Sequence, residues 1–162
     1  MAQEIERKFL LLSEEWRKHA APGIRLKQGY LSNGAAEATV RIRIAGERAF
    51  LTVKSQASGL VRAEFEYPVP LTDAETMLDT LTSGHAVEKI RHTLPAGNGL
   101  VWEIDEYLGE NSGLFTAEIE LPAEDTPFDR PEWLGAEITG DFRYANSALS
   151  VNPFSTWREK NA

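Results

Sequence analysis

Apolar and charged residues alternate along much of this chain. Between positions 40 and 44, for example, Val, Ile and Ile alternate with Arg41 and Arg43. Successive side chains of a β-strand point to opposite faces, so the pattern predicts strands with one apolar and one charged face. The same reasoning predicts eight strands, at residues 3–11, 24–31, 38–45, 48–55, 60–68, 87–94, 100–107 and 114–121.

Short turn sequences separate several of these strands. Gly46 and Glu47 lie between two alternating runs, and residues 95–99 (Pro-Ala-Gly-Asn-Gly) lie between two others. Both are typical of hairpin turns. Because short connections join antiparallel neighbours, we expect an antiparallel sheet.

Four helical segments are predicted beside the strands. Ser13, followed by two Glu, resembles a helix start, with Trp16 on the apolar side. Residues 72–75 (Thr-Asp-Ala-Glu) fit a capping box, and the apolar residues that follow predict a helix that ends at Gly84. Two more helices are predicted at 144–150 and 154–160. Such helices can cover the apolar face of the sheet.

Composition narrows the class of protein. The 162 residues suit a single domain, 1–162, and no apolar run approaches the roughly 20 residues that span a bilayer. Acidic residues near the N-terminus argue against a secretory signal. The absence of cysteine excludes thiolate metal sites and is compatible with a reducing compartment. The net charge of −8 argues against nucleic-acid binding. We expect a cytoplasmic protein that binds neither membrane nor nucleic acid.

The charged strand face is sorted by sign. Acidic pairs such as Glu118 and Glu120 occupy some strands, and basic pairs such as Arg41 and Arg43 occupy others. One interpretation is an open sheet whose charged face meets water. Sorting by sign, together with eight antiparallel strands, favours closure, which places the charges in a wet lumen. We therefore predict an α+β fold: a closed eight-stranded antiparallel β-barrel with helices packed outside.

Such a lumen has the residues for phosphate chemistry. Carboxylates in the absence of cysteine favour hard cations, Mg²⁺ or Mn²⁺, and Lys and Arg suit phosphate oxygens. The candidate metal ligands are Glu4, Glu6, Asp105, Glu118 and Glu120. The candidate phosphate-binding residues are Arg41, Arg43, Lys54, Lys89 and Arg91. Together these groups are typical of phosphoryl transfer.

Other kinds of site are less well formed in the sequence. His19, His85 and His92 are isolated, without metal-ligand spacing. The glycines at 97 and 99 lack the Lys and the following helix of a phosphate-binding loop. Ser147 and Ser150 have no base nearby in the sequence.

These residues also carry a family resemblance. Glu4-Ile-Glu6-Arg-Lys8 resembles the ExExK signature of the CYTH, or triphosphate tunnel metalloenzyme, superfamily, which includes inorganic tripolyphosphatases, thiamine triphosphatases and class IV adenylate cyclases. The likeness continues through Gln28-Gly-Tyr-Leu31, Val40-Arg-Ile-Arg43, Thr52-Val-Lys54, Glu64-Phe-Glu66, Lys89-Ile-Arg91, Trp102-Glu-Ile-Asp-Glu106, Ala117-Glu-Ile-Glu120 and Thr139-Gly-Asp-Phe-Arg-Tyr144. The family's fold is a closed eight-stranded tunnel, as the alternation predicts.

The resemblance implies roles for individual residues. One or two divalent metals would be held by Glu4, Glu6, Asp105, Glu118 and Glu120. Lys8 would lie beside the reacting phosphate. The candidate catalytic residues are therefore Lys8, Glu4 and Glu6. The five basic residues named above would bind the triphosphate, and Arg143 is a further candidate. Glu64 and Glu66 receive no assigned role, and Tyr30 either contacts phosphate or packs in the core.

The resulting functional hypothesis is Mg²⁺- or Mn²⁺-dependent hydrolysis of a small-molecule triphosphate, with inorganic tripolyphosphate preferred. One alternative is an adenylate cyclase that converts ATP to cyclic AMP. Another is a polyphosphate-binding module without catalysis, although the carboxylates argue against it, since binding an anion does not require them. A homodimer is compatible with the sequence.

Overall fold

The computed structural model describes residues 2–32 and 37–161. Its strands are β1 (Ala2–Leu11), β2 (Ile24–Tyr30), β3 (Ala38–Ala45), β4 (Arg48–Ser55), β5 (Val61–Val69), β6 (Ser83–Gly97), β7 (Leu100–Tyr107), β8 (Phe115–Glu120) and β9 (Leu134–Glu137). The α-helices are α1 (Leu71–Thr80), α2 (Asn146–Leu149) and α3 (Phe154–Asn161), and three 3₁₀ turns are η1 (Glu15–Lys18), η2 (Gly109–Asn111) and η3 (Phe142–Tyr144).

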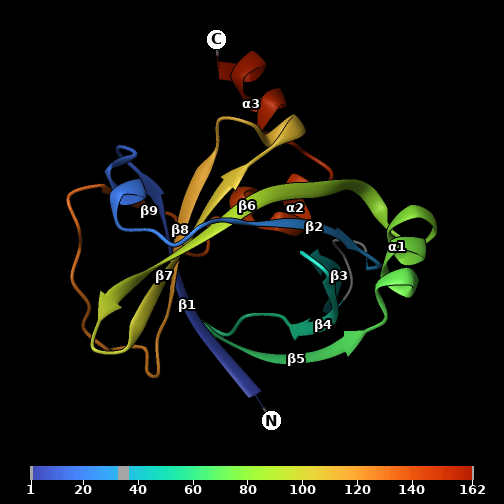
Figure 1. Cartoon of the computed structure of the whole chain (residues 1–162), viewed down its shortest axis with the longest axis horizontal. Helices are drawn as coiled ribbons and strands as arrows, with labels where there is room; N and C mark the ends of the chain where they lie inside the picture. Colours follow the sequence, from blue (N-terminus) through green and yellow to red (C-terminus); the bar gives the residue numbers. More distant parts are fainter. Residues whose placement is uncertain (1, 33–36, 162) are drawn as a thin grey trace.

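Eight of these strands close into a barrel. The order is β5-β4-β3-β2-β6-β7-β8-β1, and β5 pairs with β1 to complete the ring. Neighbouring strands are antiparallel, with Glu4 opposite Arg62 at the closing pair and Lys8 opposite Glu118 on the other side of β1. Figure 1 shows this ring from one end, with α1 outside it. The predicted closed antiparallel barrel is confirmed.

Some local predictions were wrong. Helix α1 begins at Leu71 after Pro70, with no side-chain cap, because Thr72 already lies inside the helix. The helix ends at Thr80, and Gly84 belongs to β6, where its φ of 74° and a close approach to the Ser150 carbonyl favour glycine. The predicted second hairpin is present, but its turn is shorter than expected because β6 continues through Pro95 to Gly97.

Strand β9 was not predicted. Its four residues pair with β1 beside the barrel, where Leu134 lies opposite Leu11. A side chain at Gly135 would meet the Leu10 carbonyl at 2.9 Å, so this pairing requires glycine. The segment is too short to show a recognisable alternation, and only the folded β1 provides its partner.

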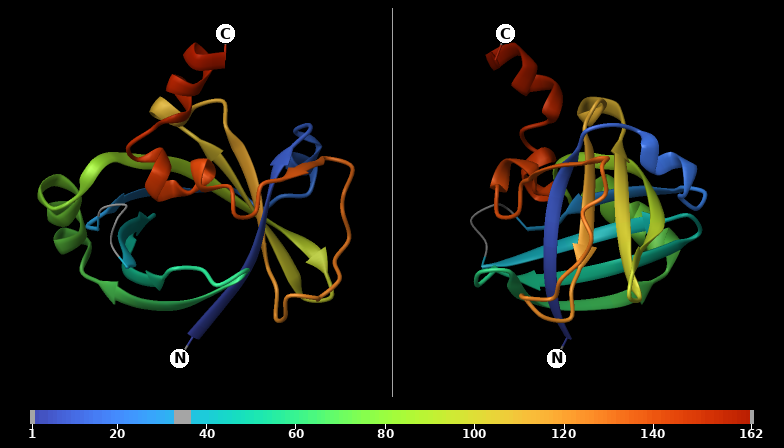
Figure 2. Two further views of the ribbon diagram at one scale, coloured as in Figure 1. Left: turned by 180° about the vertical axis from the view of Figure 1, so that it is seen from behind. Right: turned by 90° about the vertical axis from the view of Figure 1, so that its left-hand side faces the viewer.

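Apolar side chains cover the barrel from outside in two clusters. The larger one packs Phe9, Trp102 and Ile104 against Trp16 of η1 and Trp133 of the loop before β9. That loop runs along the outside of the barrel, in orange in Figure 2. Helix α1 packs Ala74 and Leu78 on Ile42 and Ala49, forming the second cluster. Helices and loops therefore cover much of the apolar strand face, as predicted.

A third cluster lies at one end of the lumen. Val87 and Tyr107 have the same strand parity as the charged residues of β6 and β7, and they pack against Leu149 of α2 and Trp157 of α3. Figures 1 and 2 show α2 lying against one end of the ring. The C-terminal segment thus places an apolar plug at that end. Among the described residues, no helix is long and apolar enough to cross a membrane.

Candidate active site

The barrel encloses a charged cavity of about 300 Å³. Its wall is built from alternate residues of the strands, together with residues 145–147 of the C-terminal segment. The lining residues are Glu4, Glu6, Lys8, Tyr30, Thr39, Arg41, Arg43, Thr52, Lys54, Arg62, Glu64, Glu66, Arg91, Glu103, Glu118, Glu120, Ala145, Asn146 and Ser147. Small-molecule sites span about 300–1,000 Å³, so the cavity suits a compact polar ligand.

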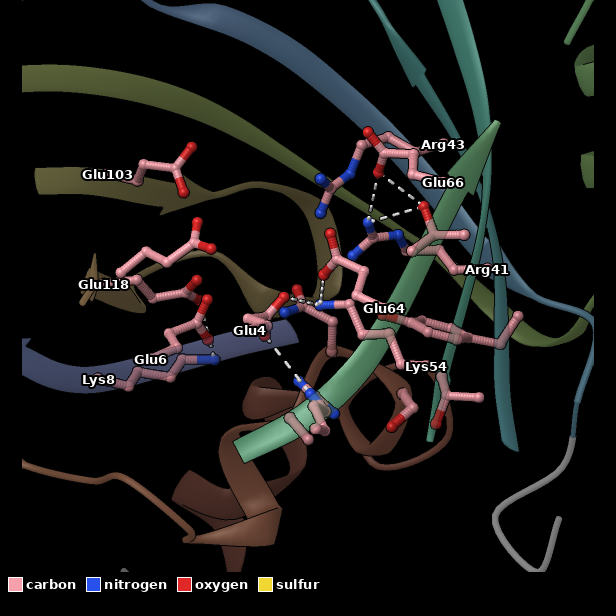
Figure 3. A pocket seen from close by; sticks show the side chains of 18 of the residues that line it. Glu4, Glu6, Lys8, Arg41, Arg43, Lys54, Glu64, Glu66, Glu103 and Glu118 are labelled. Atoms are coloured by element: carbon pink, nitrogen blue, oxygen red, sulfur yellow. Dashed lines mark hydrogen bonds and ion pairs between the residues drawn. The ribbon is translucent and has the colours of Figure 1, made fainter. Parts of the chain in front are cut away.

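Acidic and basic side chains both line the cavity. In Figure 3, Glu6 and Glu118 lie on one side with Lys8, while Arg41 and Arg43 lie across from them, near Glu66. Among the described lining residues, seven Glu face six Lys or Arg. Because these charges nearly cancel, a polyanion that entered alone would leave the cavity strongly negative. A polyanion accompanied by cations would not.

Two pairs of carboxyl groups in the cavity are close enough to share a proton. Glu6 hydrogen-bonds to Glu118, and Glu4 hydrogen-bonds to Glu64. Burial and the negative charge of Glu118 raise the pKa of Glu6 well above its ordinary value, and the hydrogen bond to Glu4 and burial raise the pKa of Glu64 to about 7. Each pair therefore tends to retain a proton that a cation could replace.

Lys54 and Arg41 are both close to carboxylates. Lys54 Nζ lies 2.9 Å from Glu4 Oε2 and 3.2 Å from Glu64 Oε2. Arg41 donates to Thr52 Oγ1 at 3.2 Å and lies 3.7 Å from Glu66. However, the buried Nε of Arg41 has no hydrogen-bond partner among the described residues. A buried donor of this kind is costly unless a ligand satisfies it.

Arg43 differs from the other lumen cations. Its Nε donates to Gln28 Oε1 at 2.7 Å, and among the described residues no carboxylate lies within 4 Å of its guanidinium. Burial, together with the nearby Arg41 and Arg91, lowers the pKa of Arg43 to about 10. Neighbouring positive charge without a paired anion makes this part of the wall a site for an anionic ligand.

A buried ion-pair network of Asp105, Lys89 and Arg91 lies next to the cavity. Asp105 is fully buried and accepts from Lys89 Nζ at 2.7 Å and from Arg91 Nε and Nη2 at 2.8 and 2.9 Å. Burial opposes its ionisation, but Arg91 and Lys89 hold the pKa of Asp105 far below its ordinary range. Both carboxylate oxygens are engaged, so Asp105 fixes the orientation of Arg91, which does line the cavity.

Lys8 connects β1 to the C-terminal segment. Its Nζ donates to the Tyr144 carbonyl at 2.9 Å and lies 3.4 Å from Glu118 Oε1. Burial alone would lower the pKa of Lys8, but Tyr107 and Glu118 raise it above its ordinary value. Lys8 therefore lines the cavity as a held ammonium group.

Comparison with known proteins shows the family to which this barrel and its charged cavity belong. The family model of the CYTH domain matches residues 2–147. The chain belongs to the CYTH domain family. It is 41% identical over 159 residues to an inorganic triphosphatase of Acetivibrio thermocellus, covering 98% of this chain and 100% of that protein. It is 39% identical to an inorganic triphosphatase of Nitrosomonas europaea, covering 92% and 97%.

Solved structures agree with the CYTH assignment. A crystal structure of an inorganic triphosphatase superposes with a TM-score of 0.68 at 34% identity, covering 93% of this chain and 96% of that one. A putative adenylyl cyclase from Hippeastrum superposes with a TM-score of 0.58, covering 74% of this chain and 80% of that one. At 15% identity, the second comparison supports the fold alone. The family resemblance seen in the sequence is confirmed.

The CYTH barrel brings most of the predicted site residues into one cavity. Those that line it are Glu4, Glu6, Lys8, Arg41, Arg43, Lys54, Arg91, Glu118 and Glu120. Three do not line it. Lys89 and Asp105 share the lumen-facing parity of Arg91 but are fully buried and do not line the cavity. Arg143 is exposed and makes a two-point ion pair with Asp141, its Nη2 lying 2.7 Å from Oδ2.

Arg62, Glu103 and Asn146 are among the lining residues that were missing from the sequence-derived set. Arg62 donates to Glu4 Oε1 at 3.4 Å, and Glu103 lies 3.2 Å from Arg91. Strand parity could have identified both, because Arg62 shares a face with Glu64 and Glu103 shares one with Asp105. Asn146 could not have been found in this way, since it comes from the plug.

The donor set fits a hard divalent cation in its chemistry, although the site is not preassembled. Glu4, Glu6, Glu118 and Glu120 all line the cavity, and oxygen donors of this type favour Mg²⁺ or Mn²⁺. Within residues 2–32 and 37–161, no three acidic or imidazole side chains already converge on one point. The proton-sharing pair Glu6 and Glu118 shows that negative charge is crowded there. Cation binding would relieve this crowding through side-chain rotation.

Proposed function

We propose that this protein hydrolyses inorganic tripolyphosphate in the barrel cavity, using Mg²⁺ or Mn²⁺. Two relatives with about 40% identity over nearly their full length are named inorganic triphosphatases, which supports a phosphoanhydride hydrolase. Two features of the cavity support the substrate class: the charge of Arg43, which has no carboxylate partner among the described residues, and the carboxyl pairs, which retain protons where cations could bind.

The observation that carries the proposal is the state of Arg43. Among the described residues, this partly buried guanidinium has no carboxylate partner and lies near Arg41 and Arg91, which is electrostatically unfavourable in the free protein. A string of phosphate oxygens would neutralise Arg43 and provide an acceptor for the buried Nε of Arg41. Guanidinium groups bind such oxygens through paired hydrogen bonds.

Size and polarity favour the inorganic substrate. The cavity of about 300 Å³ is lined almost entirely by charged and polar side chains, with Tyr30 as its one aromatic group among the described residues. A nucleobase would require apolar surface that this lining does not offer. The described cavity thus favours tripolyphosphate over ATP.

Each part of the chain has a distinct task in this proposal. Arg41, Arg43 and Arg91 would bind the phosphates and absorb the charge that develops on the leaving group. Lys8, held by the Tyr144 carbonyl and Glu118, would direct a charged hydrogen-bond donor at the phosphate that reacts. The carboxylates that would hold the metal are Glu4, Glu6, Glu118 and Glu120. The bound cation supplies charge neutralisation and lowers the pKa of water.

A phosphate-release screen tests the proposal. Protein would be incubated with tripolyphosphate, ATP or thiamine triphosphate, in Mg²⁺, Mn²⁺ or EDTA. We expect phosphate from tripolyphosphate only when metal is present. Cyclic AMP from ATP would show a cyclase instead, and binding of tripolyphosphate without phosphate release would show a non-catalytic module.

A matched pair of variants tests the role of the carboxylates. Glu4→Gln is expected to abolish hydrolysis while retaining much of the affinity for the anion. Glu47→Gln makes the same change on an exposed turn outside the cavity and should hydrolyse at the wild-type rate. Equal turnover in the two variants would remove Glu4 from the metal site.

A further inference from the structure

The C-terminal segment contributes a polar side chain to the cavity that the preceding mechanism does not use. Asn146 is the first residue of α2 and lines the cavity between the plug and the ion-pair network. Its Oδ1 accepts hydrogen bonds from Lys89 Nζ at 3.2 Å and from Tyr107 Oη at 3.0 Å. Both donors come from the barrel wall.

These two contacts fix the orientation of the amide. Lys89 Nζ, which also donates to Asp105 at 2.7 Å, and the Tyr107 hydroxyl both act as donors toward the amide. The atom of Asn146 that faces them is the oxygen, Oδ1. The Nδ2 group, with two N–H donors, is left on the other side of the amide, and it donates to no described residue.

Asn146 therefore has a free donor at the wall of a cavity built for anions. Among the lining residues of the C-terminal segment, its neighbour Ala145 has no polar side chain, and the Ser147 side chain hydrogen-bonds to no described residue of the barrel. The preceding Tyr144 holds Lys8 through its carbonyl. One short segment is thus tied to two lysines of the barrel, Lys8 and Lys89.

We propose that Asn146 is a substrate-binding residue: its carbonyl is anchored on Lys89 and Tyr107, and its Nδ2 donates to an oxygen of the bound polyphosphate. This inference rests on the proposed function and adds to it a neutral donor supplied by the plug. Closure of the barrel end and recognition of the anion would then depend on the same residue.

Two substitutions separate this role from a purely structural one. Asn146→Asp keeps an oxygen for Lys89 and Tyr107 but replaces the free donor with a negative oxygen that faces the anion. Asn146→Ala removes both functions. If Asn146 only anchors the plug, folded Asn146→Ala should bind tripolyphosphate like wild type and lose only thermal stability. If it binds the anion, affinity should rank wild type first, Ala second and Asp last.

The measurement is calorimetric titration with tripolyphosphate in EDTA, where hydrolysis is not expected. We expect roughly tenfold or greater weakening for Asn146→Ala, as for loss of a hydrogen bond to a charged group, and greater weakening for Asn146→Asp. Asn152→Asp, the same charge change at an exposed position of the C-terminal segment, should bind within about twofold of wild type. Thermal unfolding of each variant identifies any loss of fold.

The outcomes distinguish this inference from the proposed function. Wild-type protein that neither binds tripolyphosphate nor releases phosphate from it would overturn both. Wild-type protein that does both, with Asn146→Asp binding as tightly as Asn152→Asp, would overturn the role of Asn146 alone. Should Asn146→Asp fail to fold, an Asn146→Ala variant that folds and binds like wild type would overturn it equally.

Discussion

Arg43→Gln tests the claim that the cavity is strained in the absence of ligand. The pKa of Arg43 is lowered from an ordinary 12.5 to about 10. At about 1.4 kcal/mol per pKa unit, this corresponds to roughly 3 kcal/mol of unfavourable interaction for the charged group. Loss of the hydrogen bond to Gln28 would return about 1 kcal/mol of that. The variant should therefore unfold at equal or higher denaturant concentration than the wild type.

The same substitution should weaken ligand binding. A hydrogen bond to a charged group contributes about 1.5–3 kcal/mol, so tripolyphosphate affinity should fall by roughly 10- to 150-fold. The pH dependence follows from the sign of the shift. The unfolded chain binds more protons than the folded one between about pH 10 and 12.5, so stability rises with pH only in that window, and the full cost is present at pH 7.

Urea unfolding without metal and calorimetric titration with tripolyphosphate would measure the two effects. Arg25→Gln is the matched control, because Arg25 lies on neighbouring β2 with an exposed side chain paired to Glu88. The control should change neither quantity by much, since exposed ion pairs contribute little. An Arg43→Gln protein clearly less stable than wild type, with unchanged affinity, would refute the strain argument.

Three further predictions follow from the described contacts. Asp105→Asn removes the partner of two buried cations, Lys89 and Arg91, so it should lower the free energy of unfolding by about 3–5 kcal/mol, as measured by urea titration. A loss below about 1 kcal/mol would contradict the stabilising role of this ion-pair network. Arg143→Ala should leave phosphate release within about twofold of wild type, because this exposed side chain is bound to Asp141; a large fall in rate would restore Arg143 to the site. Addition of Mg²⁺ to metal-free protein near pH 6 should release protons, because the pKa of Glu6 is raised in the folded protein, and metal affinity should increase with pH. Calorimetry in buffers of different ionisation enthalpy would detect the released protons. Zero proton release would contradict ligation of the metal by these carboxylates.

Alternation along the chain was sufficient to predict the barrel. Side chains of a strand alternate between its two faces, so residues such as Glu4, Glu6 and Lys8 must share a face. Eight antiparallel strands with one charged face favour a closed barrel whose water-filled lumen holds the charges. Parity therefore predicted most of the strand residues that line the cavity, and the same rule would have added Arg62 and Glu103. These are properties of local backbone geometry, and the sequence expresses them directly.

Tertiary structure decided which of the aligned charges reach the ligand. Lys89, Asp105 and Arg91 follow the same parity, yet only Arg91 lines the cavity. Asn146 of the plug contacts Lys89, and Asp105, opposite Arg91 in the strand register, is engaged by Arg91 and Lys89. Arg143 is outside the predicted site because its side chain is exposed and bound to Asp141. Asn146 entered the site only when α2 folded over the end of the barrel. Such contacts between segments distant in sequence depend on packing, which no local periodicity encodes.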